Sequence, residues 1–306
     1  MQRTSSRGFT LVELLVVIGI IALLISILLP SLNRARAAAN SIDCQSRLRQ
    51  MGQAMQIYAV NNKDVLPYGQ IWHNAPYTEP GVPGGHNEEW WKWTYTLTEA
   101  LGTDPIDSSG WVNRMSPLFI DKDTYGEKVW GWVSHYTANP RVFAHGAERD
   151  DAPAVLGGGA AIPAGQVPPK KVGQIENASE VMVIWDGPQG LNQGNNALEL
   201  AISMDGWMYF WGHCYYRPVP ASSWINADRP IQPGALDAQT NPTAEYARSL
   251  QKRHNRDEAD IWTFHSHLRF RHLQNTSLNG LFVDGHVEGR KVGEVMVRDI
   301  TVTYRR

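Results

Sequence analysis

The most extended hydrophobic pattern of the chain lies at its N-terminus. Residues Phe9–Leu29 are nearly all apolar, and this run is long enough for a helix that crosses a lipid bilayer. Glu13 interrupts the run near its N-terminal end. A charged side chain at the centre of a membrane helix costs about 2.5–3.5 kcal/mol, and less toward the helix ends. A carboxylate retained in this segment therefore needs a functional reason.

The helical pattern continues beyond the apolar run. Apolar residues recur at three- and four-residue steps, as an amphipathic helix requires. They are Leu32, Ala35, Ala39, Ile42, Leu48, Met51, Met55 and Tyr58. We expect one helix from about Thr10 to Asn61, kinked at Pro30 because proline lacks the backbone N–H that the helix needs there. Its first half would be a transmembrane anchor, and its second half would pack on a globular head.

Residues 62–306 predict an α+β head in which a mixed, mainly antiparallel β-sheet with long loops packs on the helix. Glu88–Gly102 predicts a short helix that ends at its glycine. Arg149–Lys171 is rich in Gly, Ala and Pro and predicts an exposed loop. The tryptophans of the predicted short helix could form a platform for sugars, but tryptophan at helical spacing is more often part of a core.

Three C-terminal segments predict the sheet. Glu180–Asp186 is apolar and predicts a buried strand, and Ile261–His272 alternates as a half-buried strand does. Leu281–Glu288 contains Asp284-Gly285 between two apolar runs, a signal for a hairpin with a two-residue turn.

Composition excludes some classes of function. The formal net charge is −2, so the chain offers no electrostatic basis for binding nucleic acid. His and Asp residues are dense near the C-terminus, but no HExxH motif or nucleophile elbow is present, and we expect no catalytic site. A metal site stays open as an alternative, with Ca²⁺ or Zn²⁺ undecided and Asp284 and His286 as the candidate ligands.

The N-terminal residues resemble a known processing signal. Gly8–Ile18 reads GFTLVELLVVI, which resembles the cleavage and methylation motif of type IV prepilins and type II secretion pseudopilins. The similarity extends through Cys44–Pro67 and to three later patches, Ser134–Val142, Val172–Gly187 and Arg271–Gly289. In this longer stretch the chain looks like the large-headed pseudopilin-like proteins of planctomycetes and their relatives.

The resemblance implies a processing step and a role for Glu13. A prepilin peptidase would remove residues 1–8 by cutting after Gly8 and would methylate the new N-terminus at Phe9. In a filament, the amine of one subunit could then meet the Glu13 carboxylate of another, and this ion pair would offset the burial of both charges. A Glu13 side chain that only reaches lipid headgroups is the simpler alternative.

The expected function is that of a structural pilin or pseudopilin subunit, not an enzyme. The protein would wait in the inner membrane as a single-pass protein, with its N-terminus cytoplasmic and its head periplasmic, since Arg3 and Arg7 precede the apolar run. It would then join copies of itself in a periplasmic or cell-surface filament, with the help of the inner-membrane assembly machinery. The alternative is a membrane-anchored protein whose Trp-rich head binds polysaccharide.

Two pairs of residues carry further expectations about the head. Cys44 and Cys214 would face an oxidising compartment and could form a disulfide, with two separate buried thiols as the alternative. The resemblance places a His before an Asp-Gly-His-Val motif, as His272 precedes Asp284 here. We expect a structural His272–Asp284 pair that clasps the hairpin to the sheet, because a buried imidazole needs a partner. Metal ligation by the same two residues and a merely solvated Asp284 are the alternatives.

Overall fold

The computed structural model describes the long N-terminal helix and parts of the head that follows it. The described residues are 10–67, 69–72, 90–102, 116–122, 134–139, 142–143, 145–147, 154–156, 160–162, 170–187, 189–192, 197–201, 268–300 and 302.

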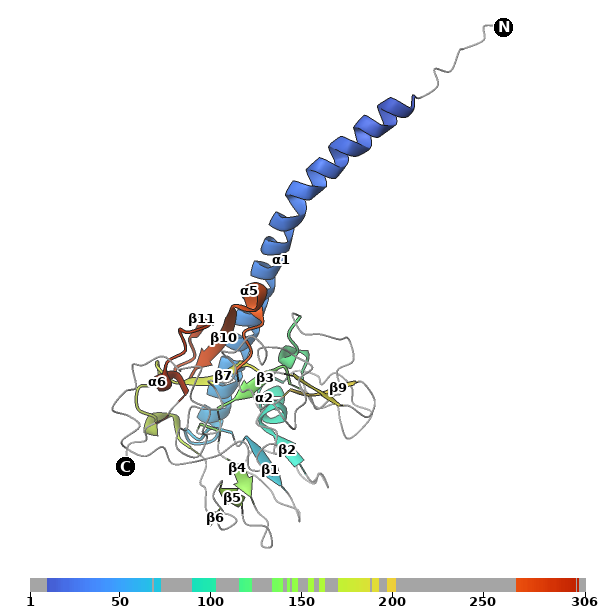
Figure 1. The fold of residues 1–306 in the computed structure, drawn as a ribbon. Coiled ribbons are helices and arrows are strands. Elements are labelled where there is room, and N and C mark those ends of the chain that lie inside the picture. Colours follow the sequence, from blue (N-terminus) through green and yellow to red (C-terminus); the bar gives the residue numbers. More distant parts are fainter. Residues whose placement is uncertain are drawn as a thin grey trace.

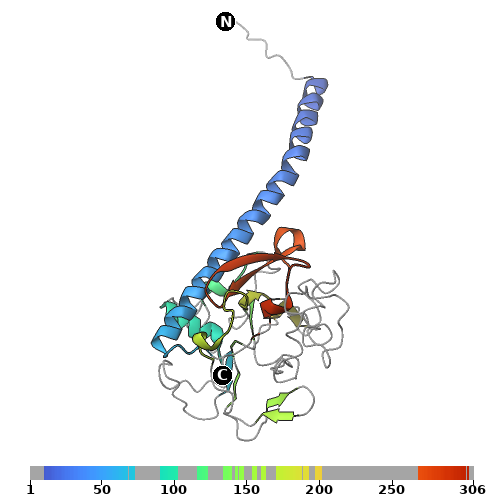
Figure 2. The ribbon, with the colours of Figure 1, turned by 90° about the vertical axis from the view of Figure 1, so that its left-hand side faces the viewer.

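Helix α1 (Leu11–Asn61) is the stem of the molecule. Its N-terminal half, called the far half below, extends well beyond the head (Figures 1 and 2). Thr10 is its N-cap, and it runs unbroken through Pro30 while bending gently along its length (Figure 1). It ends at Asn61, and the N–H of the C-cap residue Asn62 donates to the carbonyl of Tyr58. The extent of the single long helix predicted from the sequence is therefore confirmed, but the helix curves gently instead of showing the kink expected at Pro30.

The head is built on a four-stranded antiparallel sheet with the strand order β11-β10-β7-β3. The strands are β3 (Tyr136–Ala138), β7 (Met182–Asp186), β10 (Ser277–Phe282) and β11 (Val287–Lys291). All five residues of β7 are buried, which confirms the buried strand predicted there. The long helix and the mainly antiparallel sheet together make an α+β, pilin-like layout.

Strands β10 and β11 form the predicted hairpin, but its turn is one residue longer than expected. Leu281 pairs with Val287, and the N–H of Phe282 donates to the carbonyl of His286. Three residues, 283–285, therefore form the turn. Gly285 ends it with φ +96°, a left-handed conformation that glycine adopts without steric cost.

Shorter elements complete the described part of the head. Three strands form a second sheet in the order β2-β1-β4, namely β1 (Gln70–Trp72), β2 (Trp90–Lys92) and β4 (His145–Ala147). Two hairpins are β5 (Ala154–Leu156) with β6 (Ala160–Ile162), and β8 (Gln189–Asn192) with β9 (Ala197–Ala201). The helices are α2 (Trp93–Leu101), η1 (Pro117–Phe119), η2 (Val172–Gln174), α5 (His272–Asn275) and α6 (Val297–Ile300).

Three sequence predictions need correction here. The helix predicted from Glu88 begins only at Trp93, because Trp90 pairs with Trp72 in a strand. The loop predicted over residues 149–171 contains the β5–β6 hairpin. Of the strand predicted to end at His272, residues 268–271 lie outside any strand and His272 opens α5; its earlier residues lie outside the described part.

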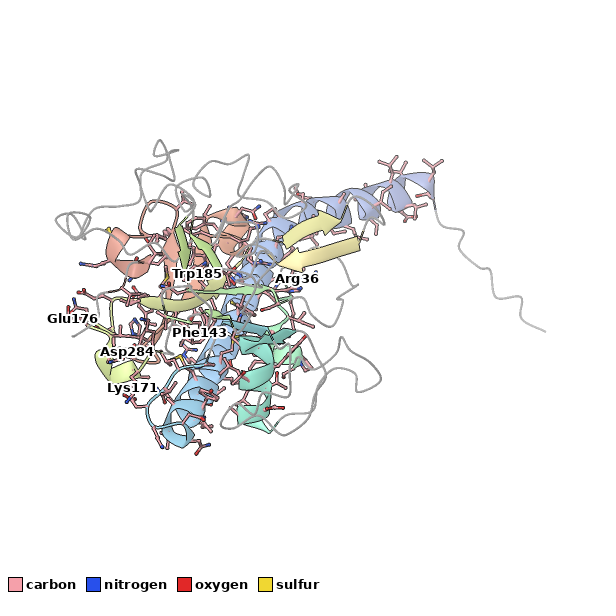
Figure 3. All side chains as sticks on the ribbon, turned by 90° about the horizontal axis from the view of Figure 1, so that it is seen from below. Arg36, Phe143, Lys171, Glu176, Trp185 and Asp284 are labelled. Carbon is pink, nitrogen blue, oxygen red and sulfur yellow. The ribbon has the colours of Figure 1, made fainter. Side chains whose placement is uncertain are left out.

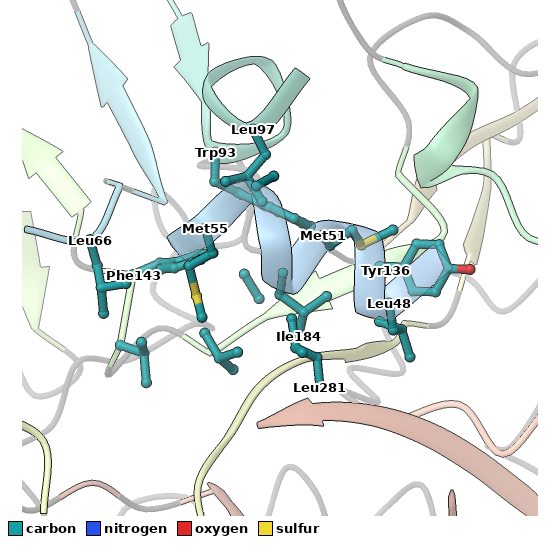
Figure 4. Close-up of a cluster of buried hydrophobic side chains, with 14 of the residues drawn as sticks. Leu48, Met51, Met55, Leu66, Trp93, Leu97, Tyr136, Phe143, Ile184 and Leu281 are labelled. Carbon is teal, nitrogen blue, oxygen red and sulfur yellow. The ribbon is translucent and has the colours of Figure 1, made fainter. Parts of the chain in front are cut away.

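The core forms where the near half of α1 meets the sheet. Leu48, Met51 and Met55 of α1 pack among buried side chains that include Trp93, Leu97, Phe143, Ile184 and Leu281 (Figure 4). A second cluster contains Met182, Trp185, Leu268, Phe270, Leu278, Phe282, Val295 and Ile300. The amphipathic stripe is thus confirmed from Leu48 to Tyr58, whereas Leu32 and Ile42 are exposed.

Candidate functional site

The far half of α1 exposes an unusual amount of apolar surface. Every residue from Thr10 to Arg36 is exposed, and most of the large side chains among them are Leu, Ile or Val. Figure 3 shows these side chains directed away from the helix axis. Among the described residues, α1 is the one helix whose length and composition would allow it to cross a membrane. Since apolar surface is unfavourable in water, this half requires a covering, either lipid or protein.

Glu13 is held at the start of this apolar half by a capping box. Its carboxylate accepts hydrogen bonds from the backbone N–H of Thr10 at 2.9 Å and from the Thr10 hydroxyl at 2.8 Å. In return, the N–H of Glu13 donates to the Thr10 hydroxyl oxygen at 3.3 Å. The side chain therefore serves as a helix cap in the single subunit. Gly8 and Phe9 lie outside the described residues.

The predicted pairing of His272 with Asp284 is wrong. His272 is fully buried, and its Nε2 lies 3.2 Å from Asp186 Oδ2 and 3.4 Å from Asp121 Oδ2. Asp284 is instead exposed in the hairpin turn, where its Oδ1 lies 2.6 Å from Nδ1 of His286.

The reason is a sharp reversal of the chain after His272. Residues 273–275 all have positive φ, and His272 forms a bridge with Ser277 at the start of β10. The hairpin turn with Asp284 lies at the other end of β10, about 17–20 Å away along the strand. The imidazole and this carboxylate are therefore separated by the length of the strand.

The interior holds a cluster of four polar side chains from four separate segments. Cys44 comes from α1, Asp121 from the segment after η1, Asp186 from the end of β7, and His272 from the start of α5. One ligand atom from each lies within 4.8 Å of the others, and all four residues are buried. Among the described residues, this is the group of three or more such side chains that could hold a metal ion.

The thiol of Cys44 takes part in this cluster as a free cysteine. Its Sγ lies 3.4 Å from Asp186 Oδ1 and accepts a contact of 3.6 Å from the Tyr136 hydroxyl. Burial and then the negative charge of Asp186 raise the pKa of Cys44 well above that of an exposed thiol. Cys214 lies outside the described residues. Cys44 is therefore a buried free thiol, which was the alternative to the disulfide.

Sequence reasoning did not find Asp121 and Asp186 as site residues. The pattern presents Asp186 as the last residue of a buried strand, and an acidic residue at the end of an apolar strand is itself a signal for a buried polar site. Asp121 stands in no recognisable motif. The metal candidates Asp284 and His286 contact each other on the surface and lie outside the buried cluster, which of the sequence candidates contains only Cys44 and His272.

Comparison with known proteins bears on the N-terminal half of α1. Residues 3–29 match the family described as the prokaryotic N-terminal methylation motif. The chain carries a prepilin-type N-terminus. Its methylation motif covers both the expected cleavage junction and Glu13.

One curated relative is a pilin. The chain is 40% identical over 58 residues to the type IV wide pilus major component PilA4 of Thermus thermophilus. This match covers 19% of the chain and 44% of PilA4, so the chain spans less than half the length of that relative. No solved structure matches the chain.

Proposed function

We propose that the protein is a structural pilin or pseudopilin subunit, cleaved between Gly8 and Phe9 by a prepilin peptidase, that assembles into a type IV pilus-like or type II secretion filament. The observation that carries the proposal is the exposed apolar half of α1 with Glu13 near its start. The methylation motif over residues 3–29 and the similarity to a pilus component support it.

The exposed half of α1 has two coverings in this account. Before assembly, the lipid bilayer solvates the apolar side chains, with the N-terminus in the cytoplasm and the head in the periplasm. After extraction, the same side chains pack against those of neighbouring subunits at the filament centre. Each covering removes apolar surface from water and gains a free energy of about 25 cal/mol per Å². Because lipid and filament supply a similar gain, the free energy of moving the helix from one to the other is close to zero.

Glu13 distinguishes a filament subunit from a simple anchor. An anchor needs no carboxylate, and apolar residues would insert better at this position. Cleavage would leave Glu13 as the fifth residue of a chain that begins with a charged amine. An amine from a neighbouring subunit can join Thr10 as a partner of this carboxylate, and breaking such a buried ion pair is costly. The charge would therefore select the correct register during assembly.

The alternative of a sugar-binding head receives less support. Trp93, one of the residues expected on the aromatic platform, is fully buried and packs against Phe119 and Phe143 with ring centroids 5.4 and 5.8 Å apart. Its ring is therefore part of the core. We accordingly assign the head a structural role.

The test is to look for the protein in filaments. Material sheared from the cell surface and filaments isolated from the periplasm would be examined by electron microscopy and mass spectrometry. We expect the protein in filaments, with Phe9 as an N-methylated first residue. Recovery of the chain only as a monomer in the membrane fraction, with residues 1–8 still attached, would overturn the proposal.

A further inference from the structure

The buried cluster of Cys44, Asp121, Asp186 and His272 combines the side chains that bind zinc. Thiolate, imidazole and carboxylate are the ligands that Zn²⁺ takes in proteins, usually four in a tetrahedron. Ca²⁺ and Mg²⁺ prefer shells made of oxygen atoms, so the sulfur and nitrogen here disfavour them. The donor set therefore selects one class of metal.

The four groups lie close enough together for a modest contraction to form a tetrahedral site. Bond lengths of 2.0–2.3 Å to zinc imply ligand-to-ligand separations of about 3.3–3.6 Å. The Sγ of Cys44 lies 3.4 Å from Asp186 Oδ1. Nε2 of His272 lies 3.2 Å from Asp186 Oδ2 and 3.4 Å from Asp121 Oδ2. The contacts to Cys44 and His272 use different oxygens of Asp186. With one ligand atom taken from each residue, the four atoms lie within 4.8 Å of one another, so a contraction of up to about 1.2–1.5 Å would bring the widest pair to tetrahedral spacing.

Surrounding groups hold the four side chains in place. The backbone N–H of Asn279 donates to Asp186 Oδ2 at 2.6 Å. The backbone N–H of Asp121 donates to Nδ1 of His135 at 2.7 Å, which fixes the segment that presents Asp121. The Tyr136 hydroxyl lies against the Cys44 sulfur. Metal sites in proteins depend on such outer contacts to orient their ligands.

Burial adds an electrostatic argument. Asp121 and Asp186 are 2% and 0% exposed, and each contacts the same imidazole nitrogen. Two carboxylates this close inside a protein repel each other and lose their hydration, so a cation between them lowers the free energy of the folded state. A divalent ion can supply this charge and also bind the thiolate.

We propose that Cys44, Asp121, Asp186 and His272 form a structural binding site for a divalent transition metal, with Zn²⁺ as the preferred ion. The metal would join α1 to three segments of the head that are distant in the sequence. It would hold the stem in a defined position on the sheet, a function separate from filament assembly. The competing account is a metal-free network in which a protonated His272 bridges the two carboxylates.

The test begins with the wild-type full chain, purified in detergent from cells grown with added zinc. Elemental analysis by mass spectrometry should find one zinc ion per chain. After replacement by Co²⁺, the absorption spectrum should show the strong visible bands of a tetrahedral site and a thiolate-to-cobalt charge-transfer band. Absence of metal together with absence of the cobalt bands would overturn the proposal and leave the metal-free network.

Two variants locate the metal. Cys44→Ser should abolish the thiolate-to-cobalt band and weaken zinc binding at least tenfold, as measured by competition with a chromophoric chelator. The matched control is the double variant Asp284→Asn with His286→Gln, which alters the exposed pair and should bind zinc as the wild type does. Loss of zinc from the control with retention in Cys44→Ser would place the metal at the surface and refute the buried site.

Discussion

Gly52 of α1 lies against Leu281 of β10 so closely that a Cβ atom on Gly52 would come within 2.9 Å of Leu281 Cδ1. This contact lies in the main core, where the stem packs on the central sheet. The distance between α1 and β10 therefore depends on the absence of a side chain at position 52.

Replacement of Gly52 by Val should destabilise the head. The added methyl groups must displace Leu281, and overpacking of this kind costs about 1–3 kcal/mol. Thermal unfolding of the full chain in detergent, followed by circular dichroism, measures the effect. Gly19→Val is the matched control, because nothing lies within 4 Å of a Cβ at position 19. Equal melting temperatures for the two variants would contradict the tight contact.

Replacement of Gly285 by Ala should cost more stability than replacement of Gly293 by Ala. Both glycines have left-handed backbones, with φ of +96° and +90°, so both variants carry a strain of about 1 kcal/mol. At position 285 the new Cβ also comes within 2.6 Å of Gln56 Nε2, whereas nothing lies within 4 Å at position 293. Gln56 is exposed and flexible, so its amide can move away, and the extra cost is the small one of losing its hydrogen bond to the carbonyl of Asp284.

A Gln56→Ala background separates the two causes. The extra cost at position 285 should disappear there, because the contact with α1 is gone and only backbone strain remains. The measurement is the free energy of unfolding in denaturant for the single and double variants. An unchanged difference in the Gln56→Ala background would show that the side chain of Gln56 plays no part.

Glu13 variants test the role of its charge in assembly. Glu13→Val should insert into the membrane as well as the wild type or better, yet fail to form filaments. Glu13→Gln keeps an oxygen that can accept the hydrogen bonds of Thr10, so it preserves the helix cap while it removes the charge. We expect Glu13→Gln to fail as well, as judged by electron microscopy of sheared filaments.

Comparison of the two variants separates the helix-capping role of Glu13 from the role of its charge. Normal filaments from Glu13→Gln with none from Glu13→Val would mean that the cap matters and the charge does not. Normal filaments from both would leave the ion pair without support. Membrane fractionation of each variant confirms that insertion is intact.

Processing should depend on the small residue before the cleavage junction. A bulky residue in Gly8→Leu should block entry of the chain into the peptidase, so that the uncut form accumulates in the membrane. Ser6→Leu, inside the expected leader, is the control and should be cut normally. N-terminal sequencing of exported wild-type protein should begin at Phe9, and a start at Met1 or near Ala38 would refute the prediction.

The sequence by itself determined the elements whose hydrogen bonds and hydrophobic patterns are local. The apolar run Phe9–Leu29 and the stripe from Leu48 to Tyr58 predict α1, because helix bonds join residues four apart and the pattern repeats at the same spacing. The buried strand ending at Asp186 and the hairpin at Asp284-Gly285 can likewise be predicted from short stretches of sequence. The prepilin-type motif lies within one such window.

The tertiary structure alone decided which distant residues meet. Trp90 became part of a strand because Trp72 pairs with it, an interaction that outweighs the helical spacing of its neighbours. His272 was correctly expected to be buried, but its carboxylate partners are Asp121 and Asp186 rather than Asp284. His272, Asp121 and Asp186 come from segments with no common motif, so no sequence pattern predicts that they lie close together in three dimensions. Their convergence depends on how α1, β7 and α5 pack together, and packing of that kind is set by contacts across the whole core.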